Sequence, residues 1–347
     1  MVPPVSFAEA FRTWLKIGCL GFGGPAGQIA LMHRILVDEK KWVEESRYLH
    51  ALNFCMLLPG PEAQKLATYV GWLLHGVRGG LAAGILFVLP GALVMLAISL
   101  LYVLGRGIPV VDGALFGIKA AVLVIVVEAL IRIGKRALKT RLLVGLAAAA
   151  FVGIFFFDLP FPLIVVLAAV TGYFLEKSKR ASPGEAIAGR WRQAGLAATV
   201  GLVVWWTPVL LFLLWLGKDH VLVDIGLFFS KLAVVSFGGA YALLAYMAQQ
   251  AVENYGWMSA PEMVDGLGFA ETLPGPLIKV TQFVGFLGAW RSPEPFSPVG
   301  AAVLGSVLTT WVTFVPPMML IFAGAPFVEQ LRANQRLSGA LAAITAA

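Results

Sequence analysis

The chain has 347 residues, of which 59% are hydrophobic and 13% charged, and its mean hydropathy is +0.85. Soluble globular domains carry about 25% charged residues, so this composition excludes an ordinary soluble domain. The net charge of +7 does not indicate nucleic-acid binding, because the basic residues gather in short loops between apolar segments.

Apolar segments of about twenty residues, the length that crosses about 30 Å of hydrocarbon, follow one another along the whole chain. The sequence therefore predicts an all-α polytopic membrane protein. The expected segments are 11–32, 49–74, 81–104, 113–131, 142–157, 161–175, 194–216, 225–248, 263–289, 298–323 and one that begins near residue 338.

Two loops between these segments are strongly basic, and short cytoplasmic loops carry such an excess of Lys and Arg. They span residues 132–141 and 176–192. The turn around Asp158 contains neither Lys nor Arg, which indicates that it faces outward. We therefore expect a multi-pass protein whose N-terminus and two basic loops are cytoplasmic.

The first part of the chain recurs at a constant spacing of 215 residues. The matching pairs are Phe22-Gly23-Gly24 with Phe237-Gly238-Gly239, Trp42 with Trp257, and Leu58-Pro59-Gly60-Pro61 with Leu273-Pro274-Gly275-Pro276. Without a gap, 14 of the 46 positions from Lys16 to Pro61 are identical to their counterparts. With a gap of one residue, Lys65 matches Lys279. Lysine, tryptophan and Pro-Gly-Pro in register indicate an internal duplication rather than shared composition.

The duplication divides the chain into three parts. Residues 1–175 form the first repeat, residues 176–223 a basic cytoplasmic linker with a connecting transmembrane helix, and residues 224–347 the second repeat. The second copy stops at Ala347, the counterpart of Ala121, whereas the first copy continues through two more segments. We therefore expect the second repeat to be truncated, with its C-terminal helices missing from this sequence.

Charge also predicts how the two repeats are oriented. The loop of residues 33–47 carries four Lys or Arg residues, and its counterpart, residues 248–262, carries none. This difference is expected of inverted-topology repeats, which place equivalent loops on opposite sides of the membrane. The basic loop is cytoplasmic if the first two segments of each repeat are re-entrant hairpins, broken at 23–25 and 59–61. Ordinary full spans are the alternative, and they predict the same inversion.

The Pro-Gly-Pro triplets interrupt apolar helices, since proline removes a backbone donor and glycine adds flexibility. Irregular backbone at membrane depth is tolerated where it is buried in protein or lines a wet cavity. Paired interruptions are therefore the best indication in a sequence of a transporter binding site. Helices that restart at Pro61 and Pro276 are expected to present free N–H groups, which bind anions with the help of the helix dipole. These groups belong to Glu62, Ala63, Gln64, Leu277, Ile278 and Lys279.

Buried lysines strengthen the prediction of an anion site. Lys65 and Lys279 lie within about one turn of the interruptions, and helical side chains lean toward the N-terminus, so both ammonium groups are expected to point at the gap. Lys16 and Lys231 form a second pair, expected to give electrostatic support, with snorkelling to the headgroups as the alternative. The expected substrate-binding residues are Gly23, Gly24, Pro59, Gly60, Pro61, Gln64, Lys65, Ser236, Gly238, Gly239, Pro274, Gly275, Pro276, Lys279, Thr281 and Gln282.

Two acidic residues are candidates for proton coupling. Glu62 follows the first triplet, where it also suits a simple helix cap, and Glu271 lies three residues before Pro274. The two cysteines and four histidines show no metal-ligand spacing, and no nucleotide-binding loop or nucleophile–base pair is visible. We therefore expect neither a metal nor a cofactor, and no enzymatic activity.

These motifs resemble the chromate transporter family in its two-domain, long-chain form. The segments that carry the resemblance are Phe22-Gly23-Gly24-Pro25, Trp42, Leu58-Pro59-Gly60-Pro61-Glu62-Ala63-Gln64-Lys65, Ser236-Phe237-Gly238-Gly239 and Leu273-Pro274-Gly275-Pro276. The resemblance implies homologous halves in antiparallel orientation in a bacterial-type inner (plasma) membrane, and efflux of chromate with sulfate as a related anion. Ala240 stands where Pro25 stands in the first half, which departs from strict two-fold symmetry.

We therefore expect an exporter of chromate, with sulfate as a second candidate substrate, that works by alternating access. Its expected partners are the dianion, the lipid bilayer and a counter-ion, either a proton or an anion, with a homodimer left open and no nucleic acid. An anion channel or an importer of sulfate-like oxyanions is the alternative, because sequence ranks neither the two tetrahedral dianions nor the direction of transport.

Overall fold

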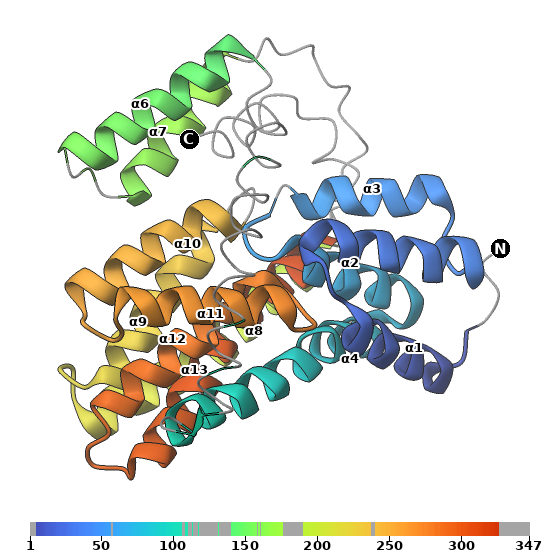
Figure 1. The fold of residues 1–347 in the computed structure, drawn as a ribbon. Helices are drawn as coiled ribbons and strands as arrows, with labels where there is room; N and C mark the ends of the chain where they lie inside the picture. Colours follow the sequence, from blue (N-terminus) through green and yellow to red (C-terminus); the bar gives the residue numbers. More distant parts are fainter. Residues whose placement is uncertain are drawn as a thin grey trace.

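The computed structural model describes residues 5–56, 58–105, 140–157, 161–175, 190–236 and 240–325, with isolated positions 108, 109, 113, 117, 131 and 159. Over these residues the chain forms helices and turns without any strand, so the all-α prediction is confirmed for this part of the chain (Figure 1). The segments expected at 113–131 and from residue 338, and the two basic loops, lie wholly or largely outside the described residues.

The helices follow one another in three groups. The first group is α1 (Phe7–Leu20), α2 (Gly24–His33), the π-helical turn η1 (Arg34–Glu39), α3 (Glu45–Met56) and α4 (Glu62–Leu104). The second is α6 (Arg141–Phe157), α7 (Phe161–Leu175) and α8 (Arg190–Leu216). The third is α9 (Val221–Val235), α10 (Ala240–Gln249), the π-helical turn η2 (Gln250–Asn254), α11 (Ala260–Thr272), the 3₁₀ turn η3 (Leu277–Lys279), α12 (Val280–Arg291) and α13 (Pro298–Gly324). In Figure 1, α1–α3 lie on one side and α9–α12 on the other, and α4 runs from the first group toward the second.

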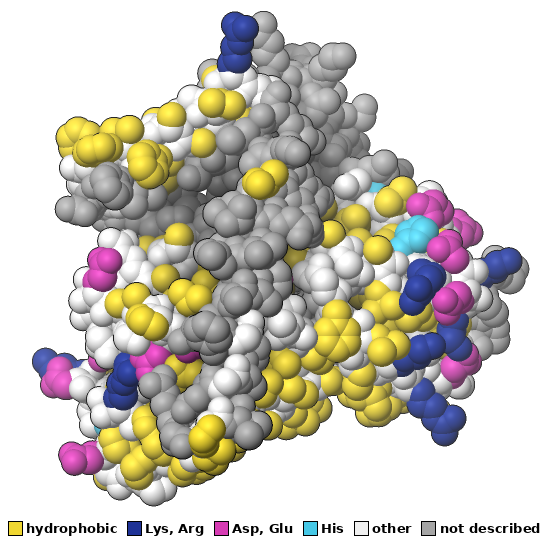
Figure 2. All heavy atoms as spheres, in the orientation of Figure 1, with side chains coloured by type: hydrophobic (Ala, Val, Ile, Leu, Met, Phe, Trp, Pro, Cys, Tyr) yellow, Lys and Arg dark blue, Asp and Glu magenta, His cyan; other side chains and the backbone are white. Residues whose placement is uncertain are grey.

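Three helices in the described part of the chain are long and apolar enough to cross a membrane: Glu62–Leu104, Trp191–Leu216 and Pro298–Gly324. Large apolar side chains such as Leu101 and Leu214 remain exposed on them, as expected of helices that pack in lipid. Figure 2 shows an apolar surface over the lower part of the molecule, with charged side chains gathered mainly toward its left and right ends. The structure and composition thus agree with a membrane protein.

Helix interruptions are present at the repeated motifs that the structure describes. Residues 21–23 separate α1 from α2, and residues 57–61 separate α3 from α4. In the second half, α9 ends at Val235 and Ser236 is not helical, while residues 237–239 lie outside the described residues. Residues 273–276 separate α11 from η3.

Equivalent positions in the two halves also make the same backbone hydrogen bonds. The Trp42 N–H donates to the Leu36 carbonyl oxygen at 2.8 Å, and the Trp257 N–H donates to the Ala251 carbonyl oxygen at 2.8 Å. Both donors and both acceptors are 215 residues apart, and each bond closes the π-helical turn that precedes the tryptophan. The repeated tryptophans therefore have matching local structure.

Glycines allow two pairs of helical segments to approach closely. α4 bends sharply at His75 and Gly76, whose backbone angles are not helical, and the bend brings Gly71 against Gly79. α12 and α13 meet in the same way, since a Cβ atom on Gly305 would lie 2.4 Å from the carbonyl oxygen of Gly285. Small residues at helix contacts are typical of membrane proteins, where van der Waals packing drives helix association.

Gly305→Ala is expected to lower the free energy of unfolding by about 1–3 kcal/mol, because the added methyl group collides with the α12 backbone. Gly145→Ala in α6 is the matched control, since nothing lies within 4 Å of its Cβ position and alanine favours a helix. Thermal unfolding in one detergent checks both variants. An unchanged midpoint for Gly305→Ala would contradict the close contact of α12 with α13.

Candidate functional site

Each Pro-Gly-Pro turn is hydrogen-bonded to the helix interruption of the other half of the chain. We name residues 58–61 turn 1 and residues 273–276 turn 2. In turn 1, the Gly60 N–H donates to the carbonyl oxygen of Ser236 at 2.7 Å, a bond that we name junction 1. In turn 2, the Gly275 N–H donates to the carbonyl oxygen of Gly21 at 2.9 Å, which we name junction 2. Since Gly21 and Ser236 are 215 residues apart, the two junctions join equivalent atoms.

The turns also pack tightly against the long helices of the opposite half. Gly60 has a φ of +101°, and a Cβ atom there would lie 2.4 Å from Cγ of Pro317 in α13. Gly275 has a φ of +94°, and its neighbour Pro274 lies so close to Gly91 of α4 that a Cβ there would be 2.1 Å from the Pro274 carbonyl oxygen. Each turn is thus fixed by the other half of the molecule.

A small cavity of about 30 Å³ lies beside junction 1. Its wall brings together α2, turn 1, the start of α4, the end of α9, and η3 with the proline before it. The lining residues are Pro25, Gln28, Gly60, Pro61, Glu62, Ala63, Ser236, Pro276, Leu277 and Ile278. The cavity therefore contains the first residues of both helices that restart after a Pro-Gly-Pro triplet.

The two helix starts present backbone donors differently. In α4, the first bond within the helix runs from the Lys65 N–H to the Pro61 carbonyl oxygen at 3.0 Å, so the three preceding N–H groups have no acceptor within the helix. In the second half the helix starts as a 3₁₀ turn, and the Lys279 N–H donates to the Pro276 carbonyl oxygen at 3.0 Å. The expectation of a free Lys279 N–H is therefore wrong, and that helix start offers only Leu277 and Ile278.

Lys65 and Lys279 are both buried, each with 1% of its surface exposed. The Lys65 ammonium group donates to the Leu58 carbonyl oxygen. The Lys279 ammonium group donates to the carbonyl oxygens of Leu273, at 2.8 Å, and Gly275, at 3.2 Å. The two leucines are equivalent, so each lysine holds the carbonyl that opens its own turn. Neither lysine lines the cavity, which differs from the expectation that both point into the gap.

The other polar residues of the predicted set are buried, and none of their side chains lines the cavity, although Ser236 does. Gln64 donates to the carbonyl oxygen of Phe314, and Thr281 donates to that of Ile278. Gln282 donates to the carbonyl oxygen of Ala92 and to the Ser306 hydroxyl, both at 2.9 Å. These side chains join α4, α12 and α13 behind the site.

The remaining predicted residues are distributed as follows. Pro274, Gly275 and Pro276 are buried, Pro59 and Gly24 are half-buried, Gly23 is exposed, and Gly238 and Gly239 lie outside the described residues. Lys16 and Lys231 are exposed and do not line the cavity, and the Lys231 ammonium group donates to the Tyr246 hydroxyl at 3.3 Å. Glu62 lines the cavity, whereas Glu271 is half-buried and acts electrostatically on Lys279.

Sequence reasoning missed one residue of the cavity wall, Gln28 on α2. Its side chain is 1% exposed, and its amide nitrogen donates to the carbonyl oxygens of Gly21, at 3.1 Å, and Gly275, at 2.7 Å. Gln28 is not part of the repeated motifs, because its counterpart in the second half is Leu243. A single amide in an apolar segment, one turn after a helix interruption, was the available signal.

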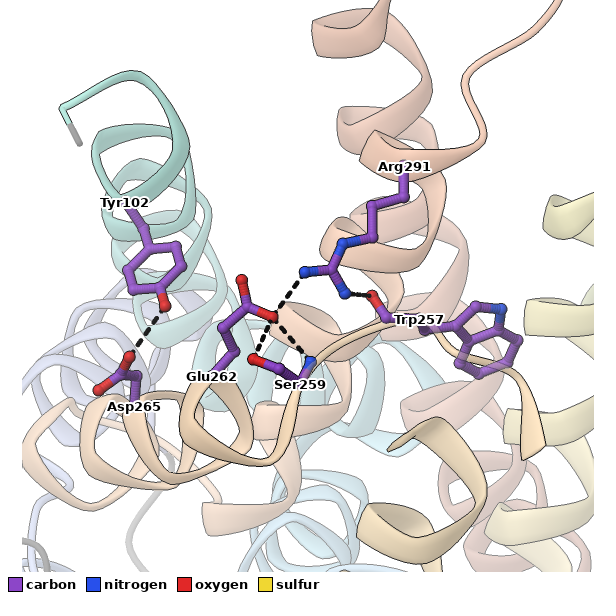
Figure 3. A network of polar contacts seen from close by, with 6 residues as sticks. All are labelled: Tyr102, Trp257, Ser259, Glu262, Asp265 and Arg291. Atoms are coloured by element: carbon purple, nitrogen blue, oxygen red, sulfur yellow. Dashed lines mark hydrogen bonds and ion pairs between the residues drawn. The ribbon is translucent and has the colours of Figure 1, made fainter. Parts of the chain in front are cut away.

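A polar network fixes the opposite end of α11, the helix that leads into turn 2 (Figure 3). Glu262 accepts hydrogen bonds from the Ser259 N–H and hydroxyl, both at 2.8 Å, and pairs with Arg291 of α12 at 2.6 Å. One turn further, the Tyr102 hydroxyl of α4 donates to Asp265 at 2.8 Å. The N-terminal part of α11 is therefore tied to α4 and α12, which limits the movement of turn 2.

Comparison with known proteins identifies one family. A family model described as chromate transporter matches residues 8–173 and 223–347. The chain is 33% identical to the chromate transport protein of Pseudomonas aeruginosa, over 99% of this chain and 79% of that protein. It is 26% identical to the chromate transport protein of Cupriavidus metallidurans, over 94% of this chain and 76% of that protein. An uncharacterized transporter of Methanocaldococcus jannaschii is 25% identical over 95% of the chain and 78% of its own length. No solved structure matches the chain.

Gly60→Ala is expected to destabilise the protein more than Gly275→Ala. Both glycines have a left-handed backbone that costs a side chain about 1–2 kcal/mol. At position 60 the new methyl group also collides with Pro317, which adds about 1–3 kcal/mol, whereas at position 275 the nearest atom is 3.7 Å away. Thermal unfolding of the two variants in one detergent provides the measurement, and equal midpoints would contradict the described packing of turn 1.

Proposed function

Because the chain belongs to the chromate transporter family, we propose that it exports chromate across a membrane by alternating access, with sulfate as a related substrate. The family is one of transporters, so the chain is a transporter rather than an enzyme. The observation that carries the proposal is the cavity that contains both helix starts, together with two buried lysines behind the turns. Such an arrangement offers backbone donors and positive charge to an oxyanion.

The proposed architecture consists of two inverted repeats, residues 1–175 and 224–347, joined by residues 176–223. The 215-residue spacing, the matching bonds at Trp42 and Trp257, and the match of the family model to two segments support the duplication. The unequal charge of the loops 33–47 and 248–262 supports the inversion. The short helices on either side of each interruption, such as α1 and α2, favour re-entrant hairpins over full spans.

In this proposal the dianion rests between Pro61 and Pro276, where it accepts hydrogen bonds from the N–H groups of the two helix starts. Ser236 and Gly60 form the adjoining wall. Gly23, Gly24, Pro59, Pro274 and Gly275 shape the interruptions, while Gln64, Thr281 and Gln282 support them from behind. Gly238 and Gly239 keep the role predicted from sequence.

Lys65 and Lys279 act on the ion through their charge rather than by direct contact. Each is bonded to carbonyl oxygens of its own turn, so its position is fixed before the ion arrives. A preorganised charge in surroundings of low polarity attracts an anion without the cost of rearrangement. Lys16 and Lys231 supply weaker, more distant support, since both are exposed.

The physics of export is compatible with a dianion. A membrane potential that is negative inside favours the exit of an anion by about 2.3 kcal/mol per charge for each 100 mV, and a dianion gains about twice that. Glu62 lines the same cavity, so its carboxylate and the dianion repel each other. Protonation of Glu62, or of Glu271 near the end of α11, would relieve repulsion of the ion and exchange a proton for it.

Chromate flux in liposomes that contain the purified protein tests the function. A transporter gives saturable uptake that is accelerated by chromate or sulfate on the other side, because the binding site returns loaded. Flux that rises linearly with concentration and shows no counter-flow would favour the anion channel, and counter-flow with sulfate alone would replace chromate as the substrate.

Lys65→Met and Lys279→Met are each expected to weaken chromate binding by about tenfold or more, because each removes a buried positive charge that acts on the ion. The concentration that gives half-maximal flux provides the measurement. Lys218→Met in the exposed turn after α8 is the matched control. Wild-type half-saturation in both buried-lysine variants would remove the lysines from the site.

Cysteines placed at Glu39 and at its counterpart Asn254 are expected to react from opposite sides of the membrane, because equivalent loops of inverted repeats face opposite ways. Both positions are exposed, and the native Cys19 and Cys55 are first replaced by alanine. A membrane-impermeant thiol reagent applied to intact cells and to broken membranes provides the measurement. Cytoplasmic labelling of position 39 supports the re-entrant hairpins, and labelling of both positions from one side would contradict the inversion.

A further inference from the structure

The two junctions are equivalent in sequence position but unequal in chemistry. Junction 2 is reinforced by Gln28, whose amide nitrogen donates to the carbonyl oxygens of both residues of the junction, Gly21 and Gly275. Two hydrogen bonds therefore hold turn 2 to the first half of the chain, one from the Gly275 N–H to Gly21 and one from Gln28 to the Gly275 carbonyl oxygen. The bond from Gln28 to Gly21 fixes the amide in place within the first half. Because two carbonyl oxygens accept these bonds, the orientation of the Gln28 amide is determined by its partners.

The residue equivalent to Gln28 does not supply the corresponding bond at junction 1. The counterpart of Gln28 is Leu243, a buried side chain without a hydrogen-bond donor. Among the described residues, the direct hydrogen bond at junction 1 is the one from the Gly60 N–H to Ser236. Because each additional hydrogen bond stabilises the closed state, we expect junction 2, with its bond from Gln28, to open less often than junction 1.

The cavity borders the weaker junction. Gly60 and Ser236, the two residues of junction 1, both line the cavity, whereas Gly21 and Gly275 of junction 2 do not. Gln28 stands between them, since it lines the cavity while its amide holds junction 2. Opening junction 1 would therefore extend the existing cavity, and opening junction 2 would first require the Gln28 bonds to break.

We propose that Gln28 is a positioning residue that keeps junction 2 closed, so that the bound anion enters or leaves by way of junction 1 in the state described here. This inference rests on the proposed function for the identity of the anion, but the unequal strength of the junctions does not depend on it. Gln28 acts through turn 2, and it sets the order in which the two halves of the site open.

Hydrogen–deuterium exchange measures the opening of both junctions directly, because the Gly60 and Gly275 amides are themselves the donors. The full chain in lipid nanodiscs, without chromate, is expected to exchange the Gly275 amide about tenfold more slowly than the Gly60 amide. Fragmentation of the peptides around turns 1 and 2 resolves the two amides. Equal exchange of the two amides in the unsubstituted protein would overturn the proposal without any variant.

Gln28→Leu, which copies the residue of the second half, is expected to bring the Gly275 rate to within about twofold of the Gly60 rate and to leave Gly60 unchanged. Gln64→Leu is the control, since it removes another buried glutamine whose amide donates to Phe314 rather than to a junction. Gly275 exchange that is unaltered in Gln28→Leu, or raised equally in Gln64→Leu, would overturn the assignment.

A separate arm with chromate distinguishes this inference from the proposed function. Bound chromate is expected to slow exchange at the Glu62 and Ala63 amides of the cavity. Absence of that effect would count against the proposed function alone. Counter-flow in Gln28→Leu completes the test. A positioning role predicts a maximal rate that is severalfold lower than that of the unsubstituted protein, with a half-saturating concentration within about twofold of its value. A change confined to the half-saturating concentration would make Gln28 a ligand instead.

Discussion

Helices that stop inside an apolar bundle must find partners for the backbone groups that they leave unpaired, and this constraint organises the structure around the cavity. Each Pro-Gly-Pro turn meets it in three ways. The central glycine donates to the helix interruption of the other half, a buried lysine donates to the carbonyl that opens the turn, and the first residues of the restarting helix line the cavity. The proposed function uses the same helix starts as donors to the oxyanion.

This arrangement gives the buried lysines two roles that are inseparable. Lys65 and Lys279 neutralise the negative ends of the carbonyl groups in their turns, which makes burial of an ammonium group tolerable. In the proposed function their charge also attracts the anion. The two halves also differ at equivalent positions. Gln28 corresponds to Leu243, Pro25 corresponds to Ala240, and only the helix start in the second half is a 3₁₀ turn. These departures give the two equivalent turns different hydrogen-bond partners, and the proposed order of opening rests on that difference.

Sequence predicted the features that depend on local chemistry. The interruptions at Gly23-Gly24 and at the two Pro-Gly-Pro triplets followed from backbone rules, and the all-α class followed from the apolar segments. Partners of the turns were not predictable, because the bonds from Gly60 to Ser236 and from Gly275 to Gly21 join residues far apart in the chain. The contacts of Lys65 and Lys279 were predicted wrongly for a related reason. A lysine side chain that leans toward a turn can donate to the carbonyl oxygens of that turn instead of pointing into the cavity. A sequence repeat does not determine which face of a helix is exposed. The sequence therefore left two alternatives for Lys16 and Lys231, and the packing shows that both are exposed.

The most direct test of the account is to locate the ion itself. Anomalous X-ray diffraction from chromium, recorded on crystals of the protein grown with chromate, reports the ion's position without reference to the fold. The account predicts one peak between Pro61 and Pro276, within hydrogen-bond reach of the Glu62 and Ala63 amides. A dominant peak beside Lys16 or Lys231, with the cavity between the two helix starts empty, would contradict it.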